Sequence, residues 1–345
     1  MAAAPATIPP MNGMLNLAAA PPSLAALLAE QLELVSVVFE RQLASDLSAV
    51  NALCLHVEHY RGKMLRPTLV LLSGLAGTPA NVAEPAALTD KHRIIAAVAE
   101  MIHMATLVHD DVLDEADIRR RGATVNRIWG NETAVMLGDY LISNAFHLCS
   151  TAGDPAVNLA LGKVTNTLCE GELIQLHHRG DCGVDEATYL EIIRRKTASL
   201  IAECCRLGAM VSGAPDRLAG ALHRYGEALG IAFQIQDDLL DLVGEERIVG
   251  KSLGRDLDKG KITLPIIHFL RGASHAERGT ALRLIAGGDA EALRQRLIGS
   301  GAVERAGRAA ADLVDQAKQQ LVAVPAGEPR DLLAAMADAV VARDR

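Results

Sequence analysis

The sequence predicts an all-α protein that folds as one large helical bundle. Apolar residues recur at helical spacing along almost the whole chain, and no segment alternates apolar and polar residues for long enough to predict a strand. Hydrophobic residues make up 50% of the chain and aromatic residues only 3%, a composition that favours helix over strand. Because no linker-like stretch interrupts residues 22–343, we expect a single domain in this chain of 345 residues.

The first half of the chain is expected to contain six helices, because turn-forming residues follow stretches with helical periodicity. A Gly-Thr-Pro turn at 77–79, followed by Pro85, separates the third helix from the fourth, and the turn from Gly180 to Gly183 ends the sixth. The predicted helices cover residues 23–45, 47–60, 64–76, 91–115, 132–151 and 155–178.

The second half continues the helical pattern. Helices are predicted at 186–213, 216–243, 262–271 and 276–286, with further helical segments up to residue 343. The turn from Gly213 to Asp216 separates the first two, and Gly287-Gly288 follows the last. Residues 1–22, rich in Ala and Pro, are predicted to form a disordered tail, which leaves 23–345 as the folded domain.

Charge and cysteine content exclude several classes of partner and location. A net charge of −8 and a pI of about 5.8 argue against a nucleic-acid partner. The six cysteines have no CxxC or zinc-type spacing, which indicates a reducing compartment. No Lys or Arg precedes Arg41, so a secretory or mitochondrial leader is not expected. The sequence contains no run of about 18 uninterrupted apolar residues, so no transmembrane helix is predicted. We expect a cytoplasmic protein.

Two Asp-Asp-x-x-Asp clusters lie inside otherwise apolar stretches, at Asp110-Asp111-x-x-Asp114 and at Asp237-Asp238-x-x-Asp241. On a helix, residues four apart share a face and lie about 6 Å apart, so the outer aspartates of each cluster point in one direction. Such carboxylates resist burial unless a cation neutralises them. Oxygen ligands of this kind suit Mg²⁺, which completes its shell with water and substrate phosphates. The sequence therefore predicts two facing magnesium platforms with a diphosphate between them.

Each cluster is followed by a basic segment. Arg119-Arg120-Arg121 follows the first cluster, and a segment from Lys251 to Lys261 follows the second. A single Asp-Asp-x-x-Asp on a helix is often only a solvated acidic face. Two copies, each with basic residues after it, favour a site that combines metal ions with phosphate oxygens.

Six ordered motifs give the chain its resemblance to a known family. From about residue 30 to the C-terminus it resembles the trans-polyprenyl diphosphate synthases of the helical isoprenoid synthase superfamily, and most of all their bacterial medium- and long-chain branch. The motifs are Gly62-Lys63-Met64-Leu65-Arg66-Pro67, Glu100 through Asp111, Gly171-Glu172-Leu173-Ile174-Gln175, Lys196-Thr197-Ala198, Phe233 through Asp238, and Gly250-Lys251 through Pro265.

This resemblance implies a fold, an activity and a set of ligands. It implies the isoprenoid synthase fold, a helical bundle whose central cavity is lined by the two aspartate helices, with 23–345 as the catalytic domain. It also implies Mg²⁺-dependent, head-to-tail condensation of isopentenyl diphosphate with an allylic diphosphate to give an all-trans product, with two or three Mg²⁺ ions per site. A homodimer is the family expectation. The product is apolar, so loose association with a membrane surface is compatible with a cytoplasmic protein.

The resemblance also assigns roles to residues. Magnesium ligands would be Asp110, Asp114 and Asp237, with Asp111, Asp238 and Asp241 as further or supporting ligands. The catalytic set would be Asp110, Asp111, Asp114, Asp237, Asp238 and Lys196. Contacts to the allylic substrate would come from Arg119, Lys196, Thr197, Gln234, Lys251 and Lys261, and contacts to isopentenyl diphosphate from Lys63, Arg66, His103 and Arg120. One departure is Arg121, which stands where the family commonly has glycine and puts the local turn in doubt.

Product length is expected to depend on residues upstream of the first cluster. Short-chain members often place Phe or Tyr five residues before the first aspartate, where this chain has Ala105, followed by Thr106. Met101 lies one turn deeper on the same face. Because one helical turn rises about 5.4 Å, close to the length of an isoprene unit, a ladder without aromatic residues predicts a product longer than C20, about C30 to C50. Met101 could still act as a partial stop.

Three alternatives remain open. A class I terpene cyclase shares the fold but uses an Asn- or Ser-containing second metal motif and an aromatic-lined pocket, and this chain has a full second cluster and few aromatic residues. A catalytically silent regulatory subunit would lose aspartates that are intact here. A short-chain geranylgeranyl or farnesyl diphosphate synthase differs only in product length.

Overall fold

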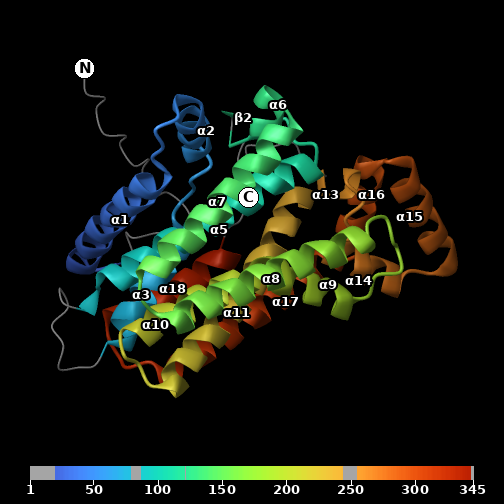
Figure 1. The fold of residues 1–345 in the computed structure, drawn as a ribbon. Helices are drawn as coiled ribbons and strands as arrows, with labels where there is room; N and C mark the ends of the chain where they lie inside the picture. Colours follow the sequence, from blue (N-terminus) through green and yellow to red (C-terminus); the bar gives the residue numbers. More distant parts are fainter. Residues whose placement is uncertain (1–19, 79–86, 121, 244–254, 343–345) are drawn as a thin grey trace.

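The structure, a computed structural model, describes residues 20–78, 87–120, 122–243 and 255–342. The predicted tail, up to residue 19, and the predicted site residue Lys251 lie outside this part of the chain, as do Pro79, Pro85 and Arg121. The described chain is an α-helical bundle (Figure 1). The prediction of an all-α fold is confirmed.

The first helices form one side of the bundle. α1 (Pro22–Leu43), α2 (Ser48–Glu58) and α3 (Leu65–Gly77) precede α5 (Asp90–Leu113). α1 is long and apolar enough to cross a membrane when judged by length and composition alone. Its buried residues nevertheless recur at helical spacing and join the main core, where α1 packs against α3 and α5. This packing is typical of a core helix in a folded domain.

The chain between the two aspartate clusters begins with a small hairpin, a short helix and two long helices. Two two-residue strands, β1 (Ile118–Arg119) and β2 (Gly122–Ala123), pair antiparallel and are followed by the short helix α6 (Val125–Trp129). The long helices α7 (Asn131–Thr151) and α8 (Pro155–His177) lie at the front of Figure 1. The expectation that no segment would be a strand therefore misses one small hairpin, which is too short to show an alternating pattern.

The predicted helix at 186–213 is interrupted. It consists of α9 (Glu186–Ile193), a π-helical turn η2 (Arg194–Ala198) and α10 (Ser199–Val211). The wider π turn accompanies a close approach to α8, because a Cβ at Gly171 would lie only 2.6 Å from the backbone nitrogen of Lys196. π turns inside helices occur frequently at functional sites. Sequence periodicity does not reveal a π turn, because the one additional residue in the turn shifts the helical register only slightly.

The remaining helices complete the bundle. α11 (Asp216–Val243) spans 28 residues, with the bounds that the sequence predicts, and packs against α10 and α17. After it come α13 (Arg255–Asp258), α14 (Leu264–Gly272), α15 (His275–Gly287), α16 (Ala290–Gly299), α17 (Ala302–Gln320), the short 3₁₀ turn η3 (Leu321–Ala323) and α18 (Glu328–Val341). Buried side chains form two clusters, one centred on α3, α5 and α10 and the other on α9, α14 and α17.

Candidate active site

The first aspartate cluster lies at the C-terminal end of α5. Asp111 is 1% exposed, whereas Asp110 and Asp114 are half-buried, and Asp114 caps the helix. Acidic groups at a helix C-terminus face the negative end of the helix dipole, an unfavourable position unless cations compensate it. The cluster is therefore held in place by charges from elsewhere in the chain.

The second cluster lies in the last two turns of α11. Asp238 and Asp241 are buried, at 7% and 2% exposure, and Asp237 is half-buried. Burial, followed by repulsion from Asp256, raises the pKa of Asp238, and hydrogen bonds from Tyr189 and Gln234 oppose that rise. Asp241 accepts a hydrogen bond from the backbone nitrogen of Asp256 at 3.1 Å.

Two lysines connect distant segments to the first cluster. Lys196, on the π turn, lies 3.5 Å from Asp110 and also pairs with Glu172 of α8. Lys261, which follows the second cluster in the chain, donates to Asp114 at 2.9 Å and lies 3.7 Å from Asp256. Segments far apart in sequence thus meet at the first cluster.

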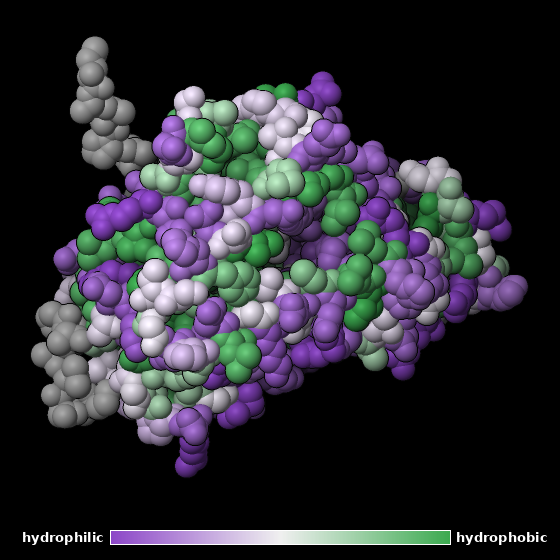
Figure 2. Space-filling model, in the orientation of Figure 1, coloured by the Kyte–Doolittle hydropathy of each residue, from purple (hydrophilic) through white to green (hydrophobic). Residues whose placement is uncertain are grey.

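Arg179 adds a further cation that the sequence reasoning missed. Its guanidinium lies 3.7 Å from Asp114, and the adjacent Gly180 donates its N–H to the carbonyl of Gly260, beside Lys261. The cations Lys261, Lys196 and Arg179 together outweigh the effect of burial and lower the pKa of Asp114. Figure 2 shows hydrophilic groups in a recess between the apolar areas of the front face.

Arg119 holds the buried aspartate of the first cluster. Its Nε and Nη2 atoms lie 2.8 and 2.7 Å from Oδ1 of Asp111. Burial raises the pKa of Asp111, and Arg119 opposes that rise. The other buried oxygen, Oδ2, has no hydrogen-bond partner in the described part of the chain. A buried carboxylate oxygen with free lone pairs is compatible with a role at a metal site.

A second basic group forms beside the first cluster. Arg66 at the start of α3 and Arg120 of the hairpin lie close enough to His103 of α5 to disfavour its charged form. Burial, then repulsion from Arg66 and Arg120, holds the pKa of His103 well below its ordinary value, so its imidazole is neutral. Gly62 admits this arrangement, because a Cβ there would lie 2.3 Å from the guanidinium of Arg120.

Glu100 is the buried counter-charge of this group, and it has no role in the sequence prediction. It is 2% exposed and lies one turn before His103 on α5. Burial raises its pKa, whereas Arg66, Arg61 and Arg120 lower it. Its position three residues before His103 in an apolar helix is the signal that could have revealed it.

Backbone strain is concentrated in the same region. In the described residues, the non-glycine positions with positive φ are Met64 (53°), Glu115 (47°) and Arg120 (49°). Each belongs to, or directly flanks, a segment that carries predicted site residues. Such conformations cost about 1–3 kcal/mol each and occur preferentially at functional sites.

Several of the predicted site residues contact one another directly. Thr197 donates to Gln234 at 2.8 Å, and Gln234 donates to Asp238 at 2.9 Å. Lys63 is exposed at the start of α3. Ala105 and Met101 are fully buried, and Thr106 donates to the carbonyl of His103.

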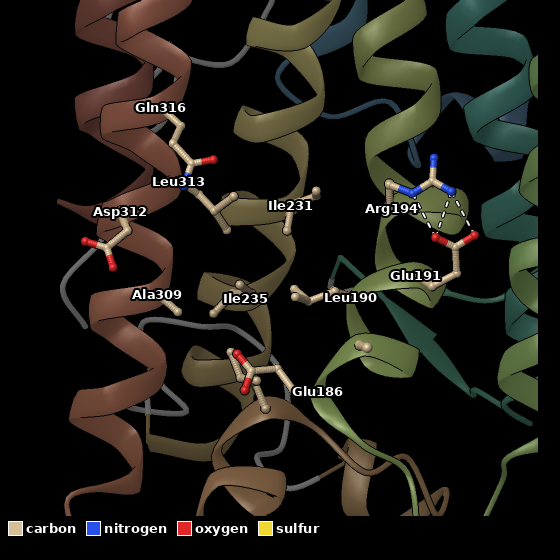
Figure 3. A pocket seen from close by; sticks show the side chains of 12 residues that line it. Glu186, Leu190, Glu191, Arg194, Ile231, Ile235, Ala309, Asp312, Leu313 and Gln316 are labelled. Atoms are coloured by element: carbon tan, nitrogen blue, oxygen red, sulfur yellow. Dashed lines mark hydrogen bonds and ion pairs between the residues drawn. The ribbon is translucent and has the colours of Figure 1, made fainter.

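Figure 3 shows a different feature, a groove of about 460 Å³ whose lining contains none of the predicted site residues.

The chain is similar to known proteins over most of its length. Residues 48–297 match the family model described as polyprenyl synthetase. The chain is 34% identical to heptaprenyl diphosphate synthase component 2 of Geobacillus stearothermophilus, over 92% of this chain and 97% of that protein. It is 36% identical to a short chain isoprenyl diphosphate synthase of Methanothermobacter thermautotrophicus, over 82% and 87%.

A solved structure gives the same result for the fold. The polyprenyl synthase from Caulobacter crescentus, complexed with calcium and isoprenyl diphosphate, superposes with a TM-score of 0.86 at 34% identity, over 93% of this chain and 97% of that one. The family-model match covers more than half of the chain, and the curated relatives match over most of both lengths. The chain belongs to the polyprenyl synthetase family.

Proposed function

We propose that the protein is a Mg²⁺-dependent trans-polyprenyl diphosphate synthase that condenses isopentenyl diphosphate with an allylic diphosphate. One observation carries the proposal: Lys196, on η2, and Lys261, beyond the second cluster, both reach the first aspartate cluster. Carboxylates for metal ions and cations for phosphate oxygens are thus assembled in one site, the combination that a diphosphate leaving group requires.

The carboxylates fit magnesium better than a metal held by protein ligands alone. In the parts of the chain that the structure describes, no three His, Cys, Asp or Glu side chains converge as a ready metal site. Mg²⁺ is usually held by one or two carboxylates and completes its shell with water and substrate phosphate. Asp110, Asp114 and Asp237 would hold the ions, with support from Asp111, Asp238 and Asp241. When bound, Mg²⁺ would supply Lewis-acid stabilisation of the departing diphosphate.

The polar and cationic side chains form two groups, one for each substrate diphosphate. The allylic substrate would be contacted near the aspartates by Arg119, Lys196, Thr197, Gln234 and Lys261, and the family resemblance adds Lys251. Beside them, Arg66, His103 and Arg120 surround Glu100 and, with Lys63, would bind isopentenyl diphosphate. A neutral His103 would act there as a hydrogen-bond donor and not as a charge.

The reaction follows from this division. The bond between C1 of the allylic chain and its diphosphate oxygen breaks, and the electron pair leaves with the diphosphate held by Lys196 and Lys261. The double bond of isopentenyl diphosphate attacks C1 and forms the new carbon–carbon bond. A proton is then lost from the resulting cation to the released diphosphate. Apolar residues around α5 would exclude water, which would otherwise capture the cation.

The product is proposed to be longer than C20, about C30 to C50, because one helical turn accommodates about one isoprene unit. Ala105 and Met101 lie in the packed core of α5 with no aromatic side chain at either position. Replacing Ala105 with Phe should shorten the product, since the ring would occupy the path of the growing chain. Ala105→Ser, which keeps a small side chain at this position, is the matched control and should leave the product length unchanged. An unchanged product distribution in Ala105→Phe would contradict the tunnel model.

A direct assay tests the proposed function. Purified protein with Mg²⁺ and labelled isopentenyl diphosphate would receive dimethylallyl, geranyl, farnesyl or geranylgeranyl diphosphate, and the dephosphorylated products would be sized by chromatography. Extension beyond C20 is the expected result. Arrest at C15 or C20 would favour the second candidate, a short-chain synthase, for which the 36% identical relative from Methanothermobacter thermautotrophicus is the specific support. No elongation by folded protein would favour the silent-subunit reading.

We further propose a cytoplasmic homodimer that uses the face formed by α7 and α8. Val135 and Met136 on α7, and Leu159 and Leu173 on α8, are between 41% and 76% exposed. The two helices pack side by side on the front of the molecule, where Figure 2 shows apolar areas among hydrophilic ones. The relative from Geobacillus stearothermophilus is named as one component of an enzyme, so a hetero-oligomer is the competing outcome. Light scattering should give twice the mass of the 36.5 kDa chain for a homodimer.

A further inference from the structure

Two neutral side chains, Tyr189 and Gln234, hold the carboxylate of Asp238 in the second cluster. The hydroxyl of Tyr189 donates to Oδ2 of Asp238 at 2.7 Å, and Nε2 of Gln234 donates to Oδ1 at 2.9 Å. Both donors are neutral, whereas the contacts to Asp110, Asp111 and Asp114 described above come from Lys or Arg. Hydrogen bonds from both sides fix the rotation of the carboxylate without cancelling its charge.

These hydrogen bonds connect three structural elements, α9, η2 and α11. Tyr189 lies on α9, which runs directly into the π turn that carries Lys196 and Thr197. Thr197 in turn donates to Gln234 of α11 at 2.8 Å. Asp238 is thereby connected to the α9–η2 segment twice, once through Tyr189 and once through Gln234 and Thr197. The position of Lys196 and the orientation of Asp238 are consequently coupled.

The hydroxyl of Tyr189 is not required for packing. The ring is 4% exposed and belongs to the core cluster that contains Ile193, Ile235 and Leu239. A phenyl ring would fill the same space, so the polar atom adds only the contact to Asp238. Burial, then the nearby charge of Asp238, raises the pKa of Tyr189 well above its ordinary value. The hydroxyl therefore remains a proton donor throughout the physiological range.

The next residue on α9 faces a different environment. Leu190 lines the groove of Figure 3, together with Ile231 and Ile235 of α11 and residues of α17. In the same view Arg194 pairs with Glu191. α9 thus presents Leu190 to the groove and Tyr189 to the second cluster, and the two neighbours can be changed independently.

We propose that Tyr189 is a positioning residue that orients Asp238 for binding the metal-complexed diphosphate of the allylic substrate. This inference rests on the proposed function, since it assigns Asp238 to that diphosphate. Tyr189 acts through Asp238 and does not itself touch substrate. Its loss should weaken the metal-dependent half of the site and leave the isopentenyl diphosphate half, around Arg66 and Glu100, unchanged.

The test compares Tyr189→Phe with Leu190→Ala. Supporting partners of metal ligands typically contribute 10- to 100-fold to metal affinity or activity. Tyr189→Phe should therefore raise about tenfold both the Mg²⁺ concentration for half-maximal activity and the Kd for farnesyl diphosphate, measured by calorimetry with Mg²⁺ and without isopentenyl diphosphate. The KM for isopentenyl diphosphate should stay within about twofold, a separation that a general loss of structure would not produce. Leu190→Ala removes packing at the groove and should leave all three values near those of the wild type.

A double variant establishes the route of the effect. If Tyr189 acts through Asp238, adding Tyr189→Phe to Asp238→Asn should have almost no further effect on the Mg²⁺ requirement, because non-additivity marks residues that act as a unit. An equal Mg²⁺ requirement and an equal Kd for farnesyl diphosphate in wild type and Tyr189→Phe would overturn the inference. An equal rise in the Kd for farnesyl diphosphate and the KM for isopentenyl diphosphate would overturn it too. A wild-type protein that fails to elongate any primer would instead overturn the proposed function.

Discussion

The two ends of α5 differ in role: the N-terminal end contributes to stability, whereas the C-terminal end carries residues of the proposed active site. At the N-terminal end, His92 is fully buried and every contact is neutral: Nδ1 accepts from the backbone of Thr89 at 3.1 Å, and Nε2 lies 2.8 Å from the Ser212 hydroxyl and 3.2 Å from the Gly208 carbonyl. A capping box between Thr89 and His92 completes this end. Both ring nitrogens of His92 therefore have partners within the protein.

The C-terminal end has the opposite character. Three acidic residues meet the negative end of the helix dipole, and Oδ2 of Asp111 is buried without a hydrogen bond in the described part of the chain. The residue after Asp114, Glu115, has a left-handed backbone. This comparison shows that the polar atoms of one helix end are satisfied within the protein, whereas the other end is completed by cations and, in the proposed function, by a metal-bound substrate.

The largest effect should come from removing a carboxylate at the C-terminal end. Asp110→Asn is expected to lower kcat/KM by about 100- to 1000-fold, since it removes electrostatic stabilisation aimed at the developing charge. The stability of the metal-free protein should be unchanged or slightly higher, because one unfavourable charge at the helix terminus is lost. Steady-state kinetics and thermal unfolding measure the two effects.

The matched control for Asp110→Asn is Asp117→Asn, which changes an exposed aspartate just beyond the cluster. It should retain almost full activity. If Asp110→Asn lost activity and stability in parallel, the contrast between the two ends of α5 would be wrong.

The next effect concerns the cation that holds Asp111. Arg119→Gln should lower the free energy of unfolding by about 3 kcal/mol, because it leaves a buried carboxylate without its charged partner. Arg127→Gln removes an exposed pair with Asp117, at 3.6 Å, and should cost less than about 1 kcal/mol. Chemical denaturation of both variants gives the comparison.

Adding Asp111→Asn to Arg119→Gln should restore much of the lost stability, since the buried charge is then gone. Stability that remains low in the double variant would show that Arg119 contributes through packing, for example against the ring of Tyr60 at 5.9 Å, and not through its charge.

The sequence predicted the helices and the two clusters because both depend on local patterns. The bounds of α11 matched, and those of α8 differed by one residue. The roles of Arg179, Glu100 and Tyr189 were not predicted, because each depends on a side chain from another segment. The π turn around Lys196 was also not predicted, since it arises from the close packing of Gly171 against η2. Local sequence thus predicted the ligands of the site, whereas tertiary packing determines which residues orient them.

The smallest predicted effect tests the N-terminal end of α5 through pH. Burial lowers the pKa of His92 from 6.5 to about 4. Between these values the unfolded chain binds a proton that the folded protein does not, so stability is complete above pH 6.5 and falls as the pH drops towards 4. Between pH 7.5 and pH 5.5 the loss should be about 1 kcal/mol.

Urea denaturation at several pH values isolates this contribution if wild type is compared with His92→Gln. The variant should be less stable at pH 7.5, because a flexible amide does not reproduce the contacts of His92 to Thr89 and Ser212. Its stability should nevertheless depend less on pH, since the residue that resists protonation is gone. Identical pH dependence in the two proteins would mean that other buried groups, such as His103, dominate, and that the neutral end of α5 does not limit stability in acid.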